Sequence, residues 1–214
     1  PTKLAEDSPA EHEHVILLAK DQQDQTVYAA NVCSLTPSIL RNFSAPVTVD
    51  DDLNCDERHH IMQHDTDLFN RWDNAQTLIS DEILAVATNP SAPVNVESIA
   101  ALADGFRYIL ADPSCLDYFK ASILTLPAIS VLESRMAPAD PVDLFNARLA
   151  VEAALGQYMK DQDYQALDPQ KLAKLAATDG GRALRNRLLA LAVAAGDMGA
   201  DDVAATQVLD PNMT

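Results

Sequence analysis

Two patterns of hydrophobic and polar residues divide this chain near residue 50. Before that point, apolar residues form short runs at 14–20, 26–32 and 45–49, each with the length and composition of a β-strand. The first two runs predict a hairpin, and the proline in the third suits a strand at the edge of a sheet. Because three short strands rarely fold alone, we expect residues 1–50 to be the last strands of an incomplete β-sandwich.

After residue 50, apolar residues recur at helical spacing to the end of the chain. Asn54 and Glu57 have the spacing of a capping box, which predicts a helix to about His64. A second helix is expected from about Asp67, with an ion pair between Asp67 and Arg71. Six of its residues are predicted to form one buried stripe: Leu68, Trp72, Ala75, Ile79, Ile83 and Val86.

Aspartate and proline residues mark further helix starts. The pairs at 112–113, 140–141 and 168–169 each predict one, because aspartate caps a helix and proline fits its first turn. The remaining helices are expected at 95–110, capped by Asn95; at 130–133, with a capping box of Ser130 and Glu133; at 179–195, capped by Asp179; and at 200–209. Residues 51–214 are therefore predicted to be mainly α, an irregular α–α superhelix similar to a solenoid.

Composition supports this fold and restricts the function. Glycine is scarce, at 6 of 214 residues, which favours helix over strand. The net charge of −17 repels phosphate, so we expect no binding to nucleic acid or to anionic membranes. The three cysteines, Cys33, Cys55 and Cys115, are far apart and form no C-x-x-C pair. They predict a reducing, cytoplasmic location without a disulfide framework.

Three histidines are the clearest candidates for metal binding. His60 and His64 are four residues apart, as in a metal-binding helix, and His59 adjoins them. The residue after His60 is Ile61, where a zinc peptidase helix of this kind carries the glutamate that activates water. We therefore interpret the histidines as exposed helix residues and expect no catalytic or metal-binding residue in this chain. A metalloenzyme using His60 and His64 is the alternative.

Four blocks of sequence, in this order, resemble the C-terminal portion of the aminopeptidase N family. They are Asn-Phe-Ser-Ala-Pro-Val at 42–47, Phe-Asn-Arg-Trp-Asp-Asn-Ala-Gln at 69–76, Ile-Leu-Thr-Leu-Pro at 123–127 and Arg-Ala-Leu-Arg-Asn at 182–186. The resemblance implies the last strands of the family's small β-sandwich, followed by the first part of its helical domain. The family's His-Glu-x-x-His zinc segment and its Gly-Ala-Met-Glu-Asn segment are absent from this sequence.

The resemblance implies a non-catalytic piece of a zinc aminopeptidase whose helical domain encloses the substrate chamber. Zinc, the catalytic domain of the same polypeptide and peptides are then the cofactor and partners of the parent enzyme. The chain does not begin with methionine, so we expect an excised or processed piece. A stand-alone helical scaffold or interaction domain is the alternative. Unpaired edges of the strands at 14–20 and 26–32 predict a possible homodimer.

Two sets of residues are selected as candidate sites. The first is interpreted as an anchor that holds the second helix to the preceding strands, with ligand contact as the alternative: Phe69, Arg71, Trp72, Asp73 and Gln76. The second set follows a pair of glycines and consists of Arg182, Arg185 and Asn186. Its candidate role is to line a cavity, and the alternative, which is the commoner outcome for such residues, is a salt-bridged surface.

Overall fold

The computed structural model describes residues 35–47, 49–162, 164, 172, 175 and 178–209. Of residues 207–209 it describes the backbone without the side chains. The chain divides into two compact units, Pro1–Pro37 and Ser38–Thr214. The predicted hairpin at 14–20 and 26–32 and the predicted helix start at 168–169 lie outside the described residues. The fold is therefore that of the second unit.

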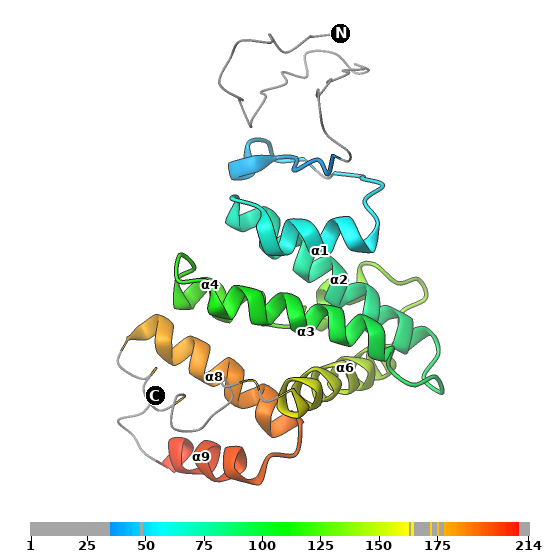
Figure 1. Cartoon of the computed structure of the whole chain (residues 1–214). Helices are drawn as coiled ribbons and strands as arrows, with labels where there is room; N and C mark the ends of the chain where they lie inside the picture. The colour runs from blue at the N-terminus through cyan, green and yellow to red at the C-terminus, as the bar shows by residue number, and fades with distance from the viewer. Residues whose placement is uncertain are drawn as a thin grey trace, which may run out of the picture. The chain divides into compact units, whose positions relative to one another are not determined.

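The described part of the second unit is built of helices (Figure 1), which confirms the mainly α prediction there. In chain order they are the 3-10 helix η1 (Arg41–Phe43) and the α-helices α1 (Cys55–His64), α2 (Leu68–Thr88), α3 (Val96–Ala111), α4 (Asp117–Ile123), α5 (Ile129–Glu133), α6 (Pro141–Asp161), α8 (Asp179–Ala194) and α9 (Met198–Leu209).

The strand expected at 45–49 is not found among its described residues, 45–47 and 49. The N–H of Val47 donates to the carbonyl of Ala45 at 3.0 Å, which closes a tight bend. A bent backbone cannot present the regular row of donors and acceptors that a sheet needs. The apolar run was therefore a poor guide here, because its proline favours a turn and its alanine has a low preference for strands.

Local caps explain most of the helix boundaries. Asn54 accepts a hydrogen bond from the Glu57 N–H at 3.0 Å, and Glu57 accepts one from the Asn54 N–H at 2.9 Å. This is the predicted capping box, and α1 ends at His64 as expected. Asn95 and Asp140 also cap their helices as predicted, with proline in the first turn of α6.

Three predicted caps are wrong. Asp112 closes a turn by accepting hydrogen bonds from the Ser114 N–H and hydroxyl, so α4 begins only at Asp117. Ser130 lies inside α5, which begins at Ile129 without a side-chain cap. Thr178, and not Asp179, caps α8 and accepts from the N–H of Gly181. The glycine pair therefore belongs to the first turn of α8.

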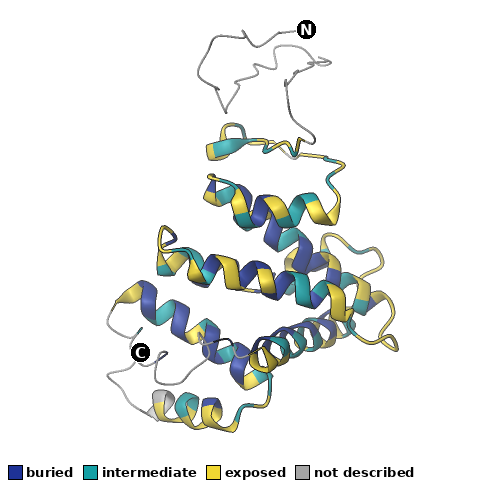
Figure 2. Ribbon diagram, viewed as in Figure 1, coloured by how far each residue is buried: buried dark blue, intermediate teal, exposed yellow. Residues whose placement is uncertain are grey.

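The helices pack in succession, each against its neighbours in the stack (Figure 1). Helix α1 packs on α2 and α3, both of which pack on α6; α6 and α4 pack on α8, and α8 packs on α9. Figure 2 shows the buried residues on the sides where helices face one another. Among the large side chains that are fully buried in the described core are Phe106, Met62, Ile79, Ile83, Leu102, Ile109, Ile123, Leu124, Leu132, Leu144, Leu155 and Met159.

The predicted stripe on α2 is confirmed in its centre only. Ala75, Ile79 and Ile83 are buried in the core. Trp72 is partly buried, and Leu68 is 45% exposed. The N-terminal turns of α2 therefore border solvent on the side that carries Trp72. The candidate site lies on this side.

Candidate functional site

The family-like block at 69–76 occupies the first turns of α2. Its side chains separate into two groups according to burial. Asn70, Arg71 and Asn74 are buried, whereas Phe69, Trp72, Asp73 and Gln76 are half-buried or exposed. The two groups make different contacts, so the block has at least two structural roles.

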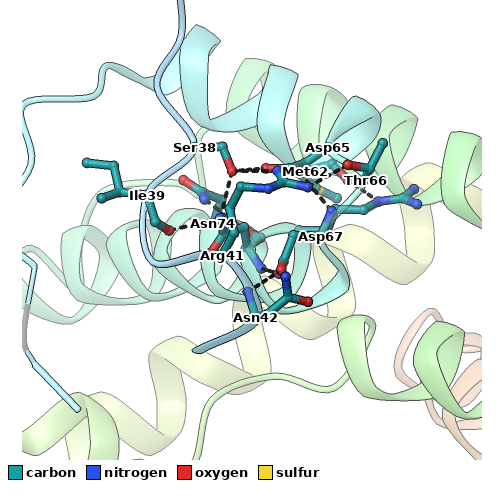
Figure 3. Close-up of polar contacts among 11 residues, drawn as sticks. Ser38, Ile39, Arg41, Asn42, Met62, Asp65, Thr66, Asp67 and Asn74 are labelled. Carbon is teal, nitrogen blue, oxygen red and sulfur yellow. Dashed lines mark hydrogen bonds and ion pairs between the residues drawn. The ribbon is translucent and has the colours of Figure 1, made fainter. Parts of the chain in front are cut away.

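Two aspartates just before α2 hold the segment that precedes the helices (Figure 3). Asp65 accepts hydrogen bonds from the hydroxyl of Ser38 and the guanidinium of Arg41, both at 2.5 Å. Asp67 accepts one from the N–H of Asn42 at 2.6 Å. We call these five residues the docking network. They fix the entry of the chain into the helical stack.

Loss of the Asp65 charge is expected to destabilise this network in a pH-dependent way. Burial raises the pKa of Asp65, but hydrogen bonds from the Asp67 N–H, Ser38 and Arg41 outweigh burial and lower that pKa overall. The stabilisation is therefore complete above the ordinary aspartate pKa of about 4 and is lost as the pH falls below it. At pH 7, Asp65→Asn is expected to lower the free energy of unfolding by about 1.5–3 kcal/mol.

Urea unfolding at several pH values tests this prediction. The difference between the natural chain and Asp65→Asn should shrink as the pH falls below about 4. Glu97→Gln, at an exposed position on α3, removes the same charge outside the network and serves as the control. A pH-independent difference, or an equal loss in the control, would contradict the assignment.

The predicted ion pair between Asp67 and Arg71 is wrong. Asp67 instead caps α2 by accepting from the N–H of Asn70 at 2.9 Å. Arg71 donates to the Met62 carbonyl at 3.0 Å and lies 3.4 Å from the carboxylate of Asp112. Arg71 therefore joins α2 to α1 and to the turn before α4. Its side chain is buried between these elements and so does not lie along the surface of α2, where Asp67 could pair with it.

Aromatic contacts connect the exposed side of the block to the preceding segment. The ring of Phe69 meets Phe43 edge to face at 4.9 Å and lies 5.9 Å from Trp72. Edge-to-face pairs of this kind stabilise packing by about 0.5–1.5 kcal/mol. Phe69 thus makes the sort of contact that the predicted anchor needs, while the anchoring role itself stays a prediction.

Trp72, Asp73 and Gln76 line a groove with a cavity volume of about 780 Å³. Its walls come from the segment before α1, from α1 and α2, and from the end of α4 and the chain between α4 and α6. The Gln76 amide donates to the carbonyl of Thr125 at 3.0 Å and so joins two of these walls. The full lining is Val49, Asp50, Asp51, Arg58, Trp72, Asp73, Gln76, Thr77, Ser80, Ser122, Thr125, Leu126, Pro127, Ala128, Val131 and Arg135.

The two arginines of the groove are already paired. Arg58 contacts the carboxylate of Asp51 at 2.5 Å, and Arg135 contacts that of Asp81 at 2.6 Å. Within the described ranges, the carboxylate of Asp73 has no hydrogen bond or ion pair. Desolvation raises the pKa of Asp73 and Asp51 adds to the increase, against the opposing effects of Arg58 and Arg135. The groove therefore holds an unbalanced negative charge.

The second candidate set does not line this groove. Arg182 pairs with Asp179 on the surface of α8, Arg185 is 3% exposed, and Asn186 is exposed. These three residues therefore face different surroundings along one helix. Their predicted role in lining a cavity of the parent enzyme stays a prediction.

Sequence reasoning missed the charges that surround the two sites. Arg58 and Arg135 lie on parts of the chain distant from the block at 69–76, and no local pattern indicates that they share its groove. Glu152 on α6 pairs with Arg187 on α8 at 2.6 Å. Partners on separate helices can be assigned only once the packing is known.

Comparison with known proteins identifies the family of this fold. The family described as "Domain of unknown function (DUF3458_C) ARM repeats" matches residues 55–214. The chain belongs to this family. ARM repeats are stacked helical units, so the match agrees with the succession of packed helices in this DUF3458_C domain.

The DUF3458_C domain is also similar to parts of larger proteins. Aminopeptidase N of Caulobacter vibrioides is 35% identical over 153 residues, which cover 70% of this chain and 17% of that protein. Aminopeptidase N of Escherichia coli is 32% identical over 148 residues, which cover 66% of this chain and 16% of that protein. The chain thus spans less than a fifth of the length of these relatives. The predicted resemblance to the C-terminal region of aminopeptidase N is confirmed.

A solved structure supports the fold. The crystal structure of Legionella pneumophila aminopeptidase A in complex with aspartic acid matches 78% of this chain and 20% of that protein, with a TM-score of 0.64. The sequence identity is 21%, so this likeness concerns the fold of the DUF3458_C domain alone.

The histidines of α1 do not fit a catalytic zinc ion. The rings of His60 and His64 are 5.0 Å apart, and both residues are exposed. A catalytic zinc site uses three protein ligands and one open position. In the part of the chain that the structure describes, no group of three His, Cys, Asp or Glu residues is placed to hold a metal ion. No helix there is long and apolar enough to cross a membrane.

Proposed function

We propose that this DUF3458_C domain is the non-catalytic wall of the substrate chamber in a zinc-dependent aminopeptidase. The parent enzyme removes N-terminal residues from peptides in the cytoplasm, and the domain restricts which peptides reach the zinc. The partners are the catalytic domain of the same polypeptide and the peptide substrate, with no nucleic acid and no membrane. The single observation that carries this proposal is the 35% identity to aminopeptidase N over a segment that is 17% of that protein.

The arrangement of the helices supports a role in shape and not in bond breaking. A stack of packed helices offers a large, rigid surface whose curvature is set by each helix pair. Hydrolysis by a zinc peptidase needs a polarised water and three metal ligands, which the paired histidines of α1 do not supply. The homodimer through strand edges at 14–20 and 26–32 concerns residues outside the described ranges and stays a prediction.

Two assays test the proposal. The purified chain, supplied with zinc, should release no product from aminoacyl 4-nitroanilides; zinc-dependent turnover that His60→Ala abolishes would favour the metalloenzyme instead. The parent enzyme lacking this domain should lose its preference for short peptides over long ones. Adding the purified chain back should restore that preference. An unchanged ratio of kcat/KM for short and long peptides would contradict a role as chamber wall.

A further inference from the structure

The groove beside Trp72 has the size and preformed walls of a ligand site. Its volume of about 780 Å³ lies within the range of roughly 300–1,000 Å³ that is typical of small-molecule and cofactor pockets. The hydrogen bond between Gln76 and Thr125 fixes the distance between α2 and the chain after α4 without any ligand. An occupant therefore does not have to order these walls when it binds.

The charges of the groove select the sign of the occupant. Three carboxylates line it, Asp50, Asp51 and Asp73, and only Asp51 has a cationic partner inside the lining. Arg135 is neutralised by Asp81, which lies outside the lining. A cation that enters the groove would meet two carboxylates without partners among the described residues, and an anion would be repelled.

Trp72 provides the second element of recognition. Its indole ring is half-buried in the groove next to Asp73, and within the described ranges its N–H makes no hydrogen bond. An indole attracts ammonium and guanidinium groups, and its N–H suits a carbonyl oxygen of a peptide backbone. The Trp72 N–H is a donor and the Asp73 carboxylate beside it is an acceptor. The two match the alternation of acceptors and donors along the backbone of an extended peptide.

We infer that this groove binds an extended peptide segment through a lysine or arginine side chain, which Asp73 receives beside Trp72. The inference goes beyond the wall function, because it concerns a binding site on the domain itself and needs no peptidase activity. Charge complementarity identifies the occupant: desolvation raises the pKa of Asp73 despite the opposing effect of Arg58, and a cation bound to this carboxylate would counteract that increase.

The chain contains one tryptophan, so its fluorescence reports directly on the groove. The probes are Ac-Ala-Ala-Lys-Ala-Ala-NH2 and the same peptide with glutamine in place of lysine. Both ends are blocked, so the lysine side chain supplies the only cation. Fluorescence titration and calorimetry should show that the lysine peptide binds at least about tenfold more tightly, as one charge-assisted hydrogen bond predicts.

Variants of single acids locate the binding. Asp73→Asn should remove the preference for lysine, and the exposed Glu97→Gln control should keep it. The helical circular dichroism and the urea midpoint of Asp73→Asn should stay near those of the natural chain, which separates lost binding from unfolding. Equal affinity for the two peptides, binding of neither, or a preference that survives Asp73→Asn would overturn the inference. None of these outcomes depends on aminopeptidase activity, so the wall function is tested separately.

Discussion

Glu152→Ala is expected to lower the free energy of unfolding by about 3 kcal/mol, because it leaves the largely buried Arg187 without its counter-charge. Glu152 is 8% exposed and contacts Arg187 at 2.6 Å, and Arg148 on the same helix lies 3.9 Å away. Burial lowers the pKa of Arg187, and Glu152 acts against that decrease. Without Glu152, two guanidinium groups would face each other between α6 and α8 with no anion between them.

Urea unfolding followed by circular dichroism at pH 7 measures this effect. The matched control is Asp81→Ala, which breaks the pair with Arg135 at the same 2.6 Å distance. That pair is exposed, at 37% and 51% for its two side chains, and such pairs contribute about 0–1 kcal/mol. A loss in Glu152→Ala no larger than that in Asp81→Ala would show that burial does not strengthen the pair.

The sequence predicts those parts of the fold that depend on neighbouring residues. The capping box of Asn54 and Glu57 and the cap at Asp140 involve residues within one helical turn, so local chemistry determines them. Asp112 has the same local signal as Asp140 but closes a turn, with Arg71 as a partner far along the chain. Ser114 therefore occupies one oxygen of the Asp112 carboxylate and Arg71 the other, and the aspartate–proline pair alone does not reveal these partners.

The same distinction applies to the candidate site. Trp72, Asp73 and Gln76 were selected because they share one sequence block, and the structure places all three on one groove. The paired arginines of that groove could not be predicted, since the pairing depends on how α1 and the chain near α5 pack on α2. Local sequence thus brings three residues of the groove together, whereas the charge balance of the groove follows from packing.

Gly156→Ala is expected to destabilise the contact between α6 and α8 by at least about 2 kcal/mol. A Cβ atom at this position would lie 2.1 Å from the carbonyl oxygen of Leu191 and 3.0 Å from its carbonyl carbon. Both atoms belong to the backbone of α8, so the helix itself would have to move. Alanine favours a helix over glycine by about 1 kcal/mol, which offsets only part of that cost.

The control for this prediction is Gly105→Ala, also in the middle of a helix. There the new Cβ would meet the terminal methyl of Met62 at 2.9 Å, the far end of a flexible side chain that can rotate away. Gly105→Ala should therefore change stability little, while Gly156→Ala should lower Tm by about 4–8 °C. Equal melting temperatures for the two variants would contradict the prediction. They would mean that α6 and α8 can move apart at little cost to make room for a Cβ atom that would otherwise lie 2.1 Å from the Leu191 carbonyl oxygen.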